Sequence, residues 1–260
     1  MTSRREIIDS LKELKQTYGA VEIKAEFEAE GSRKDELIML GEMIEQADLG
    51  FIIKIGGCEA VHDLDQCKLL GATGVMAPMI ETPFAMKKFR GAVNKVYGET
   101  NNIEHIINAE TITCHANYDE ILKEGDDFLT GVTVGRSDLS ASMGIERKKI
   151  ECDKVFDVTR DFARRGKEHG LITNFGGNIG IESVPFIIKM YDYIDRFETR
   201  KVVLGKSNDS EFLKKAIGSA LKFEFQYLRF KSEYYKSIAD EDAARIKRME
   251  NQLNMIGIEI

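Results

Sequence analysis

The sequence predicts an α/β barrel of the TIM (β/α)8 type, followed by a long C-terminal helical extension. Short apolar runs typical of strands alternate with longer amphipathic stretches typical of helices, at roughly 25–30 residues per unit. This alternation favours a parallel sheet covered by helices. The chain has 260 residues, close to the length of about 250 that is typical of one α/β barrel. From residue 209 onward the alternation stops, and the sequence becomes helical and highly charged.

Seven segments have the composition of strands, because they are short, apolar or β-branched, and bounded by turn residues. A closed barrel needs an eighth strand, for which the sequence leaves two places, the N-terminus and residues 196–200. The seven expected strands are 20–27, 51–57, 74–81, 103–110, 128–135, 171–177 and 201–205.

Helices are expected between these strands, because apolar residues recur there every three or four positions. Ser32 and Thr82 are suitable N-cap residues for two of them, and Pro83 fits the first helical position after Thr82. The expected helices are 4–17, 32–47, 59–71, 82–98, 115–125, 152–169 and 182–195.

We expect the barrel to span residues 1–208 and the helical extension to span residues 209–260. In the extension an apolar stripe continues until about residue 238 and then fades, which argues against a coiled coil. Two interpretations are open, a helix that packs on its own barrel and a helix that contacts another subunit of an oligomer. The stripe consists of Leu213, Ile217, Leu221, Phe225 and Leu228.

Composition and charge argue against several classes of protein. The net charge is −7 and no block of five basic residues occurs, so nucleic acid is not expected as a partner. No apolar run of about 18 residues is present, so we expect no transmembrane helix, and residues 1–16 lack the apolar core of a signal peptide. The four cysteines form no CxxC pair, which favours reduced thiols and a cytoplasmic protein.

Polar residues gather at the ends of the expected strands, where the working residues of parallel α/β folds lie. Burying such groups without partners is costly, so their recurrence on several strands predicts a catalytic or ligand-binding mouth. These residues are Lys54, Glu81, Asn108, Glu110, Arg136, Asp138 and Asn174, together with Glu22, Lys24 and Glu26, which alternate along the first strand.

Glu110 and Asp138 are the most informative pair. Each follows a strand, and the two strands are consecutive in the chain. Two carboxylates with no histidine or cysteine beside them suit a hard cation such as Mg²⁺ or Mn²⁺. The alternative is that Asp138 caps a helical turn that begins at Leu139. The glycine-containing turn around Ser137 also offers backbone N–H groups to an anionic group.

Three motifs carry a resemblance to a known family. The segments VMAPMIETPFAMKKF, INAET and VTVGRSDLSASMG occur in that order in the chain. Together they resemble the HpcH/HpaI aldolase and citrate lyase β-subunit family, whose members are TIM barrels of the phosphoenolpyruvate/pyruvate superfamily. The resemblance extends over residues 20–206. It implies that Glu110 and Asp138 hold a divalent metal, which chelates pyruvate or oxaloacetate and stabilises its enolate.

The chain departs from the family pattern at two positions. Lys54 stands where the family has an arginine that neutralises the developing oxyanion, so the charge is kept but the planar fork is lost. The family histidine that acts as base is missing from the segment EFEAEGSR. Lys24, Glu26 and Glu28 are close enough in sequence to replace it. The resemblance also implies an oligomer, in some members a hexamer with exchanged C-terminal helices.

The sequence therefore predicts a carbon–carbon lyase or aldolase that depends on Mg²⁺ or Mn²⁺ and acts on a 2-oxo acid. The substrate is expected to be a small anion, a 2-oxo acid or a phosphoenolpyruvate-type compound. Two alternatives are open, a phosphoenolpyruvate-using transferase of polysaccharide or secondary metabolism and a non-catalytic barrel. The expected roles are catalysis for Lys54, Lys24 and Glu26, metal binding for Glu110 and Asp138, and substrate binding for Arg136, Ser137, Asn108 and Glu81.

Overall fold

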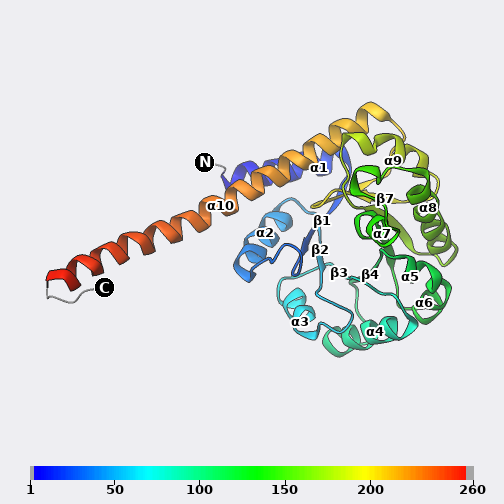
Figure 1. Ribbon diagram of the computed structural model, residues 1–260, viewed down its shortest axis with the longest axis horizontal. Coiled ribbons are helices and arrows are strands. Elements are labelled where there is room, and N and C mark those ends of the chain that lie inside the picture. Colours follow the sequence, from blue (N-terminus) through cyan, green and yellow to red (C-terminus); the bar gives the residue numbers. More distant parts are fainter. Residues whose placement is uncertain (1–2, 256–260) are drawn as a thin grey trace.

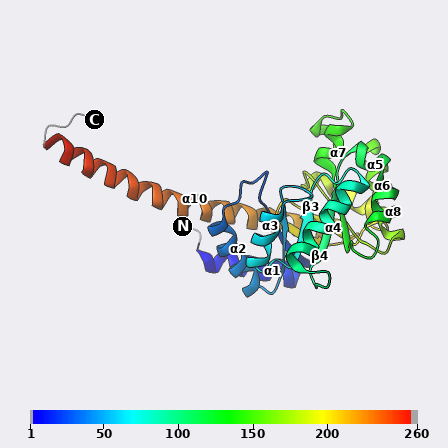
Figure 2. The ribbon, with the colours of Figure 1, turned by 90° about the horizontal axis from the view of Figure 1, so that it is seen from below.

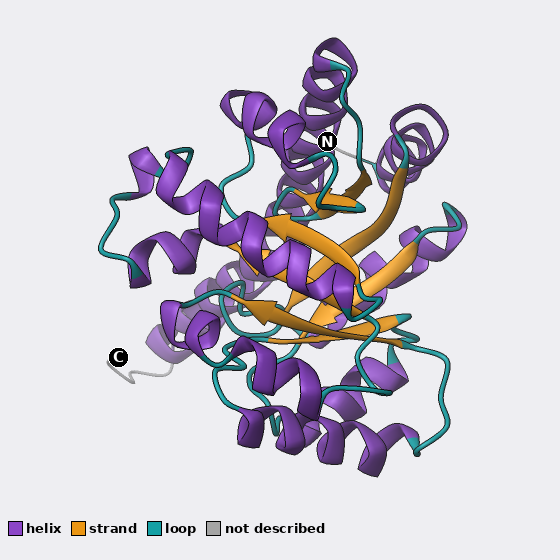
Figure 3. Cartoon of the chain, turned by 90° about the vertical axis from the view of Figure 1, so that its right-hand side faces the viewer, coloured by secondary structure: helices purple, strands orange, loops and turns teal. Residues whose placement is uncertain are grey.

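The structure is a computed structural model that describes residues 3–255, with side chains described up to residue 250. Eight strands form one sheet that curls into a nearly closed barrel, with helices around it (Figures 1 and 3). The α/β barrel prediction is confirmed. The strands are β1 Ala20–Glu26, β2 Gly50–Lys54, β3 Gly74–Ala77, β4 Glu104–Ala109, β5 Gly131–Gly135, β6 Ile172–Gly176, β7 Arg196–Glu198 and β8 Val202–Gly205.

The strand order around the barrel is β6-β5-β4-β3-β2-β1-β8-β7. Strands β1 to β6 pair in parallel, whereas β8 is antiparallel to both of its neighbours, β1 and β7. Between β6 and β7 the backbones are joined by a hydrogen bond from Asp195 N to Thr173 O of 2.9 Å. The barrel thus ends in a β7–β8 hairpin instead of an eighth parallel unit.

The missing eighth strand is β7, which lies in the second of the two predicted places. The N-terminal segment is instead helix α1, which begins at a capping box formed by Ser3 and Glu6. At the β7–β8 turn, Thr199 N donates to Val202 O over 3.0 Å, and Val202 N donates to the Thr199 hydroxyl over 3.2 Å. The hairpin places Glu198, the last residue of β7, at the end of the barrel where the cavity described below opens.

The helices follow the predicted rhythm with two corrections. Thr82 caps α4 as expected, since its hydroxyl accepts from Ala85 N over 3.1 Å, with Pro83 as the first helical residue. Ser32 is not a cap, because α2 begins after Arg33. The helix expected at 115–125 is two helices that meet at Asn117. The bounds are α1 Arg4–Tyr18, α2 Lys34–Gln46, α3 Val61–Leu69, α4 Pro83–Tyr97, α5 Ile112–Ala116, α6 Tyr118–Glu124, α7 Arg136–Ser142, α8 Asp153–Glu168, α9 Val184–Met190 and α10 Ser210–Met255, with 3₁₀ turns at Arg147–Lys149 and Ile181–Ser183.

Helix α10 packs on α1 along its first half and then extends away from the barrel (Figures 1 and 2). The expected stripe is only partly buried: Leu213 and Ile217 are buried, whereas Leu221, Phe225 and Leu228 are exposed. Residues spaced four apart rotate slowly around a helix of 3.6 residues per turn, so the buried face passes to neighbouring positions. Its buried members are Leu213, Ala216, Ile217, Ala220, Phe223 and Tyr227. In the described residues, no helix is both long and apolar enough to cross a membrane.

The apolar core lies between the strands and the surrounding helices. Inside the barrel the apolar contribution is small, a cluster of Ile52, Met76 and Ile106. Toward the carboxyl ends of the strands the interior becomes polar, since Asn108, Thr133 and Asn174 are buried and lie in register across β4, β5 and β6. A polar interior is costly for stability unless its groups are paired, so it marks this end of the barrel as the place of the site.

Candidate active site

A cavity of about 360 Å³ opens at the carboxyl ends of the strands. It brings together residues from the ends of five of the predicted strands and from β7, in agreement with the position of sites in this kind of fold. A groove of about 420 Å³ lies elsewhere, on the outer surface between α2 and α3, and contains none of the predicted site residues. The predicted residues that line the strand-end cavity are Lys24, Glu26, Lys54, Asn108, Glu110, Ser137 and Asp138.

The Glu110 carboxylate lies at the floor of this cavity with a side-chain exposure of 2%. Its Oε1 accepts from Met79 N over 3.0 Å, its Oε2 accepts from Asn108 Nδ2 over 3.0 Å, and Lys54 Nζ lies 3.7 Å from Oε2. Met79 presents its N–H from a left-handed conformation, with φ of 52°. A Cβ at Gly135 would lie 2.7 Å from Glu110 Oε2, so only glycine leaves room for the carboxylate there.

Burial raises the pKa of Glu110, and the nearby Asp138 carboxylate raises it further. Lys54, the Met79 N–H and the Asn108 amide act in the opposite direction without outweighing the burial. The positive charge of Lys54 therefore does not fully compensate the burial of the Glu110 carboxylate. A cation placed between the Glu110 and Asp138 carboxylates would supply further positive charge.

Asp138 lies in the first turn of α7, on the exposed lip of the cavity. The helix begins at Arg136 and its N-cap position is Gly135, so the alternative role of Asp138 as the cap of a turn at Leu139 is wrong. The Asp138 side chain is thereby available to a ligand in the cavity.

The donor set fits a hard cation. Besides the two carboxylates, Asn108 Oδ1 is buried and has no hydrogen-bond partner in the described part of the chain. Carboxylate and amide oxygens are the ligands that Mg²⁺ and Mn²⁺ prefer. Within residues 3–255 no group of three or more His, Cys, Asp or Glu is placed to hold a metal. A cation here would therefore take its remaining ligands from water or substrate, as Mg²⁺ commonly does.

The opposite wall of the cavity holds a second ion pair, between Lys24 and Glu198. Glu198 Oε2 accepts from Asn174 Nδ2 over 2.6 Å, and Asn174 Nδ2 also contacts the Thr133 hydroxyl at 3.1 Å. Burial lowers the pKa of Lys24, but the carboxylates of Glu198, Glu26 and Glu30 more than offset it, and the pKa is raised. Lys24 is therefore held as an ammonium group, which does not suit the role of a resting base.

The central part of the chain matches a known protein family. Residues 52–176 match the family model described as HpcH/HpaI aldolase/citrate lyase. The match covers 125 of the 260 residues of the chain. The resemblance predicted from the three motifs is confirmed, and the kind of function is that of an aldolase or lyase. No curated protein sequence matches the chain.

Solved HpcH/HpaI structures share the fold at low sequence identity. An HpcH/HpaI aldolase from Desulfitobacterium hafniense DCB-2 is 15% identical, with a TM-score of 0.59 over 85% of this chain and 88% of that chain. A family protein from Burkholderia cenocepacia J2315 is 16% identical, with a TM-score of 0.60 over 83% and 89%. The citrate synthase variant SbnG is 14% identical, with a TM-score of 0.58 over 87% and 91%. At these identities the likeness shows the fold.

Arg136, expected to bind substrate, does not face the cavity of this HpcH/HpaI barrel. Its guanidinium is fully buried beneath α7, where it pairs with Glu151 at 2.8 Å and donates to Gly176 O at 3.3 Å and Gly177 O at 3.0 Å. It also lies over the rings of Phe175 and Phe186. With its donors occupied and its charge paired, Arg136 has a structural role, and the substrate-binding expectation is wrong.

Two other predicted residues are engaged by neighbours. Glu81 does not line the cavity, because its carboxylate accepts from the Thr111 hydroxyl over 2.5 Å. Its expected contact with substrate is therefore corrected. Glu26 does line the cavity, but its carboxylate is paired with Arg200 at 2.9 Å. Because this ion pair occupies one of its oxygens, Glu26 is less available to a substrate proton, which argues against it as the replacement for the family histidine.

The structure adds residues that the sequence did not single out. Glu198 comes from β7, whose three residues are too few to show a strand periodicity. Arg147 reaches the cavity rim from a 3₁₀ turn, where its Nε and Nη2 donate to Asn178 Oδ1 over 3.1 and 2.9 Å. Asn178 follows Gly177 in the loop after β6. Irregular turns carry no periodic pattern, so Arg147 had no signal of its own.

Proposed function

We propose that the chain is a divalent-metal-dependent carbon–carbon lyase or aldolase that acts on a 2-oxo acid such as pyruvate or oxaloacetate. The observation that supports this most is the Glu110 and Asp138 pair, which the ends of adjacent strands β4 and β5 bring to one cavity. The aldolase and lyase character of the HpcH/HpaI family supports the kind of reaction.

Glu110, Asp138 and the free Asn108 Oδ1 would hold Mg²⁺ or Mn²⁺. When bound, the cation would act as a Lewis acid on the keto and carboxylate oxygens of the substrate. Lys54 would add a positive charge where negative charge develops on the enolate oxygen, since its ammonium lies 3.7 Å from Glu110. Because lysine offers a point charge and not a planar fork, it would stabilise this charge without fixing its direction as an arginine would.

The substrate carboxylate would lie near Ser137 at the start of α7. Gly177, with φ of 90°, packs against this turn, and a Cβ there would lie 2.6 Å from Ser137 N. The glycine thereby leaves room near this backbone N–H. Arg147 provides a cation on the rim, where a second anionic group of a larger substrate would meet it.

A turnover assay tests this function. Oxaloacetate, and pyruvate with a panel of aldehydes, are supplied to the full chain with Mg²⁺ or Mn²⁺, with a chelator, and with the metal restored after chelation. We expect carbon–carbon cleavage or formation that disappears with the chelator and returns with the metal. Equal turnover in the chelator would contradict the metal requirement. Phosphate release from phosphoenolpyruvate in place of these reactions would instead support the transferase, which the missing histidine and the lysines of the cavity also fit.

We also propose that the chain forms a homo-oligomer through α10. Phe225 and Leu228 lie exposed beside the part of the helix that packs on the barrel, and the distal half leaves the body (Figure 2). Exposed apolar side chains on a protruding helix are typical of a subunit contact. The cytoplasmic location and the boundary between residues 208 and 209 stay predictions.

Charged substitutions on this face are expected to dissociate the oligomer. Phe225→Asp with Leu228→Asp should reduce the mass measured by light scattering to that of a single chain, because two carboxylates cannot be buried in an apolar contact. Lys222→Glu, an exposed charge on the same helix, is the control and should leave the mass unchanged. A single-chain mass for the unmodified protein would contradict this proposal.

A further inference from the structure

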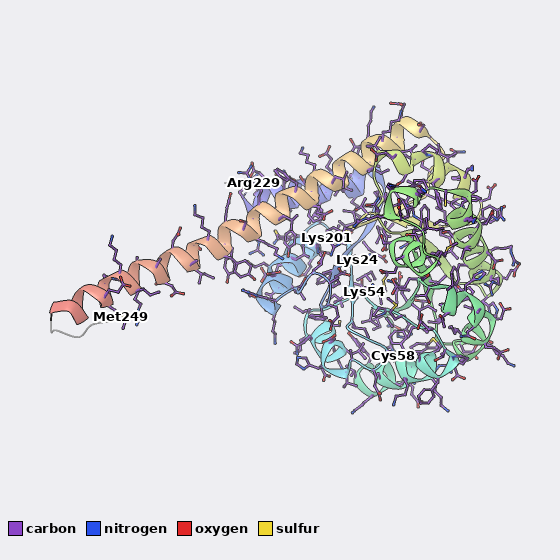
Figure 4. All side chains as sticks on the ribbon, in the orientation of Figure 1. Lys24, Lys54, Cys58, Lys201, Arg229 and Met249 are labelled. Atoms are coloured by element: carbon purple, nitrogen blue, oxygen red, sulfur yellow. The ribbon has the colours of Figure 1, made fainter. Side chains whose placement is uncertain are left out.

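Lys24 lies across the barrel from the proposed metal ligands. It belongs to β1, whereas Asp138 follows β5, and three strands separate β1 from β5 on either side of the barrel. Figure 4 labels Lys24 and Lys54 close to each other, on neighbouring strands, and both line the cavity. A small 2-oxo acid held by its carboxylate and keto oxygens near Glu110 and Asp138 therefore presents its remaining carbon toward the Lys24 wall.

The Lys24 side chain is fixed in position and yet reaches the cavity. Its partner Glu198 has a side-chain exposure of 3% and is itself held by Asn174, whereas Lys24 keeps an exposure of 13%. A lysine ammonium has three N–H donors, and in the described part of the chain only Glu198 accepts from Lys24. Two donors thus remain for a molecule in the cavity.

The other charged groups near Lys24 are already paired. On its own strand Glu26 pairs with Arg200 at 2.9 Å, and after that strand Glu30 pairs with Arg200 at 3.1 Å and with Lys201. On the neighbouring strand β2, Lys54 lies beside Glu110. Glu224 of α10 also lines the cavity without an ion pair in the described residues, but it comes from the helix outside the ring of strands. Among the described residues of the barrel strands at this wall, Lys24 is the group placed to exchange a proton with a ligand.

We propose that Lys24 is the proton donor of this site, positioned by Glu198 and Asn174, in place of the missing family histidine. This inference rests on the proposed function. In the step, the electron pair of the enolate double bond takes a proton from Lys24 Nζ, so that a C3–H bond forms, the N–H bond breaks and the C–O bond becomes a carbonyl. The neutral amine then regains a proton from water in the open cavity. In the reverse direction the neutral amine removes the C3 proton.

A competing interpretation is that Lys24 only binds an anionic group through its charge. Arginine separates the two, because it keeps the positive charge but does not give up a proton at accessible pH. If charge were the whole role, Lys24→Arg would preserve catalysis. If proton transfer is the role, Lys24→Arg removes it and leaves binding largely intact.

The test is the exchange of pyruvate C3 hydrogens for deuterium in D₂O with Mn²⁺, followed by mass spectrometry of the pyruvate. We expect the full chain to catalyse exchange, and the rate to rise with pH as the neutral amine becomes more populated below the raised pKa of Lys24. Lys24→Arg should lower the rate by about 100-fold or more, the contribution typical of general acid–base catalysis. Lys167→Arg, in an ion pair with Asp195 outside the cavity, is the matched control and should keep the rate.

Glu198→Gln tests the positioning role. Removing this negative charge lowers the pKa of Lys24, so the pH profile of exchange should move to lower pH, which a merely structural change would not cause. For Lys24→Ala, added methylamine should restore part of the exchange even if Lys24→Arg packs poorly. Unchanged exchange in Lys24→Arg, or no rescue by the amine, would overturn the inference alone. Absence of Mn²⁺ binding and of exchange in the unmodified chain would overturn the proposed function instead.

Discussion

Replacing Glu110 by Gln is expected to weaken Mn²⁺ binding by about 100-fold or more and to abolish metal-dependent turnover. Residues that only orient a metal ligand typically contribute about 10–100-fold to affinity, so a direct carboxylate ligand should contribute no less. Gln keeps an oxygen for Met79 N, so the local fold should persist. Isothermal titration calorimetry with Mn²⁺ measures the affinity, and Asp138→Asn should show a loss in the same direction.

A matched carboxylate elsewhere serves as the control for this prediction. Asp153 begins α8, pairs with Lys189 at the surface and does not line the cavity. Asp153→Asn should bind Mn²⁺ with the affinity of the unmodified chain. Undiminished affinity in both Glu110→Gln and Asp138→Asn would show that any bound metal lies elsewhere.

Replacing Arg136 by Met is expected to destabilise the fold by about 3 kcal/mol, at the lower end of the range for breaking a buried ion pair. The guanidinium bridges Glu151 to the carbonyls of Gly176 and Gly177, and the substitution removes its hydrogen bonds to all three, leaving Glu151 only the Ser183 hydroxyl. The lower end applies because Glu151 is partly exposed and can be hydrated. Arg136→Lys should recover little, because an ammonium cannot span these acceptors.

Chemical denaturation measures the free energy of unfolding for this prediction. Arg164→Met is the control, because Arg164 forms exposed pairs with Asp161 and Glu168 that should contribute no more than about 1 kcal/mol. If Arg136→Met were as stable as the control but bound substrate weakly, Arg136 would have the substrate role that its buried contacts argue against.

The periodic part of the fold was predictable from the sequence, because burial on both faces leaves a continuous apolar run in each parallel strand. The same reasoning predicted that Glu110 and Asp138 lie at the site, because Glu110 ends one such run and Asp138 comes shortly after the next. The β7–β8 hairpin was not predictable, because a strand of three residues has no period, and with it Glu198 was missed. The length of the connection between two strands does not determine whether the second strand runs parallel or antiparallel to the first.

The direction of a side chain just after a strand was the second feature that the sequence could not predict. Arg136 and Asp138 are two residues apart, yet Arg136 turns under α7 and Asp138 faces the cavity. The helix that begins at Arg136 sets these directions, and its partner Glu151 lies 15 residues further along the chain. Likewise, Lys24 was a candidate base from its position alone, whereas the carboxylates around it hold it in the charged form. Such roles depend on contacts between distant segments.

The most direct test of the metal site is a crystal structure of the full chain with Mn²⁺ and oxalate, using the anomalous signal of manganese. Oxalate presents the two adjacent oxygens that a 2-oxo acid offers to a cation. We predict one strong anomalous peak within coordination distance of carboxylate oxygens of Glu110 and Asp138, with oxalate between this peak and Lys24. A peak bound by other residues, or oxalate held in the cavity with no manganese beside Glu110, would contradict it.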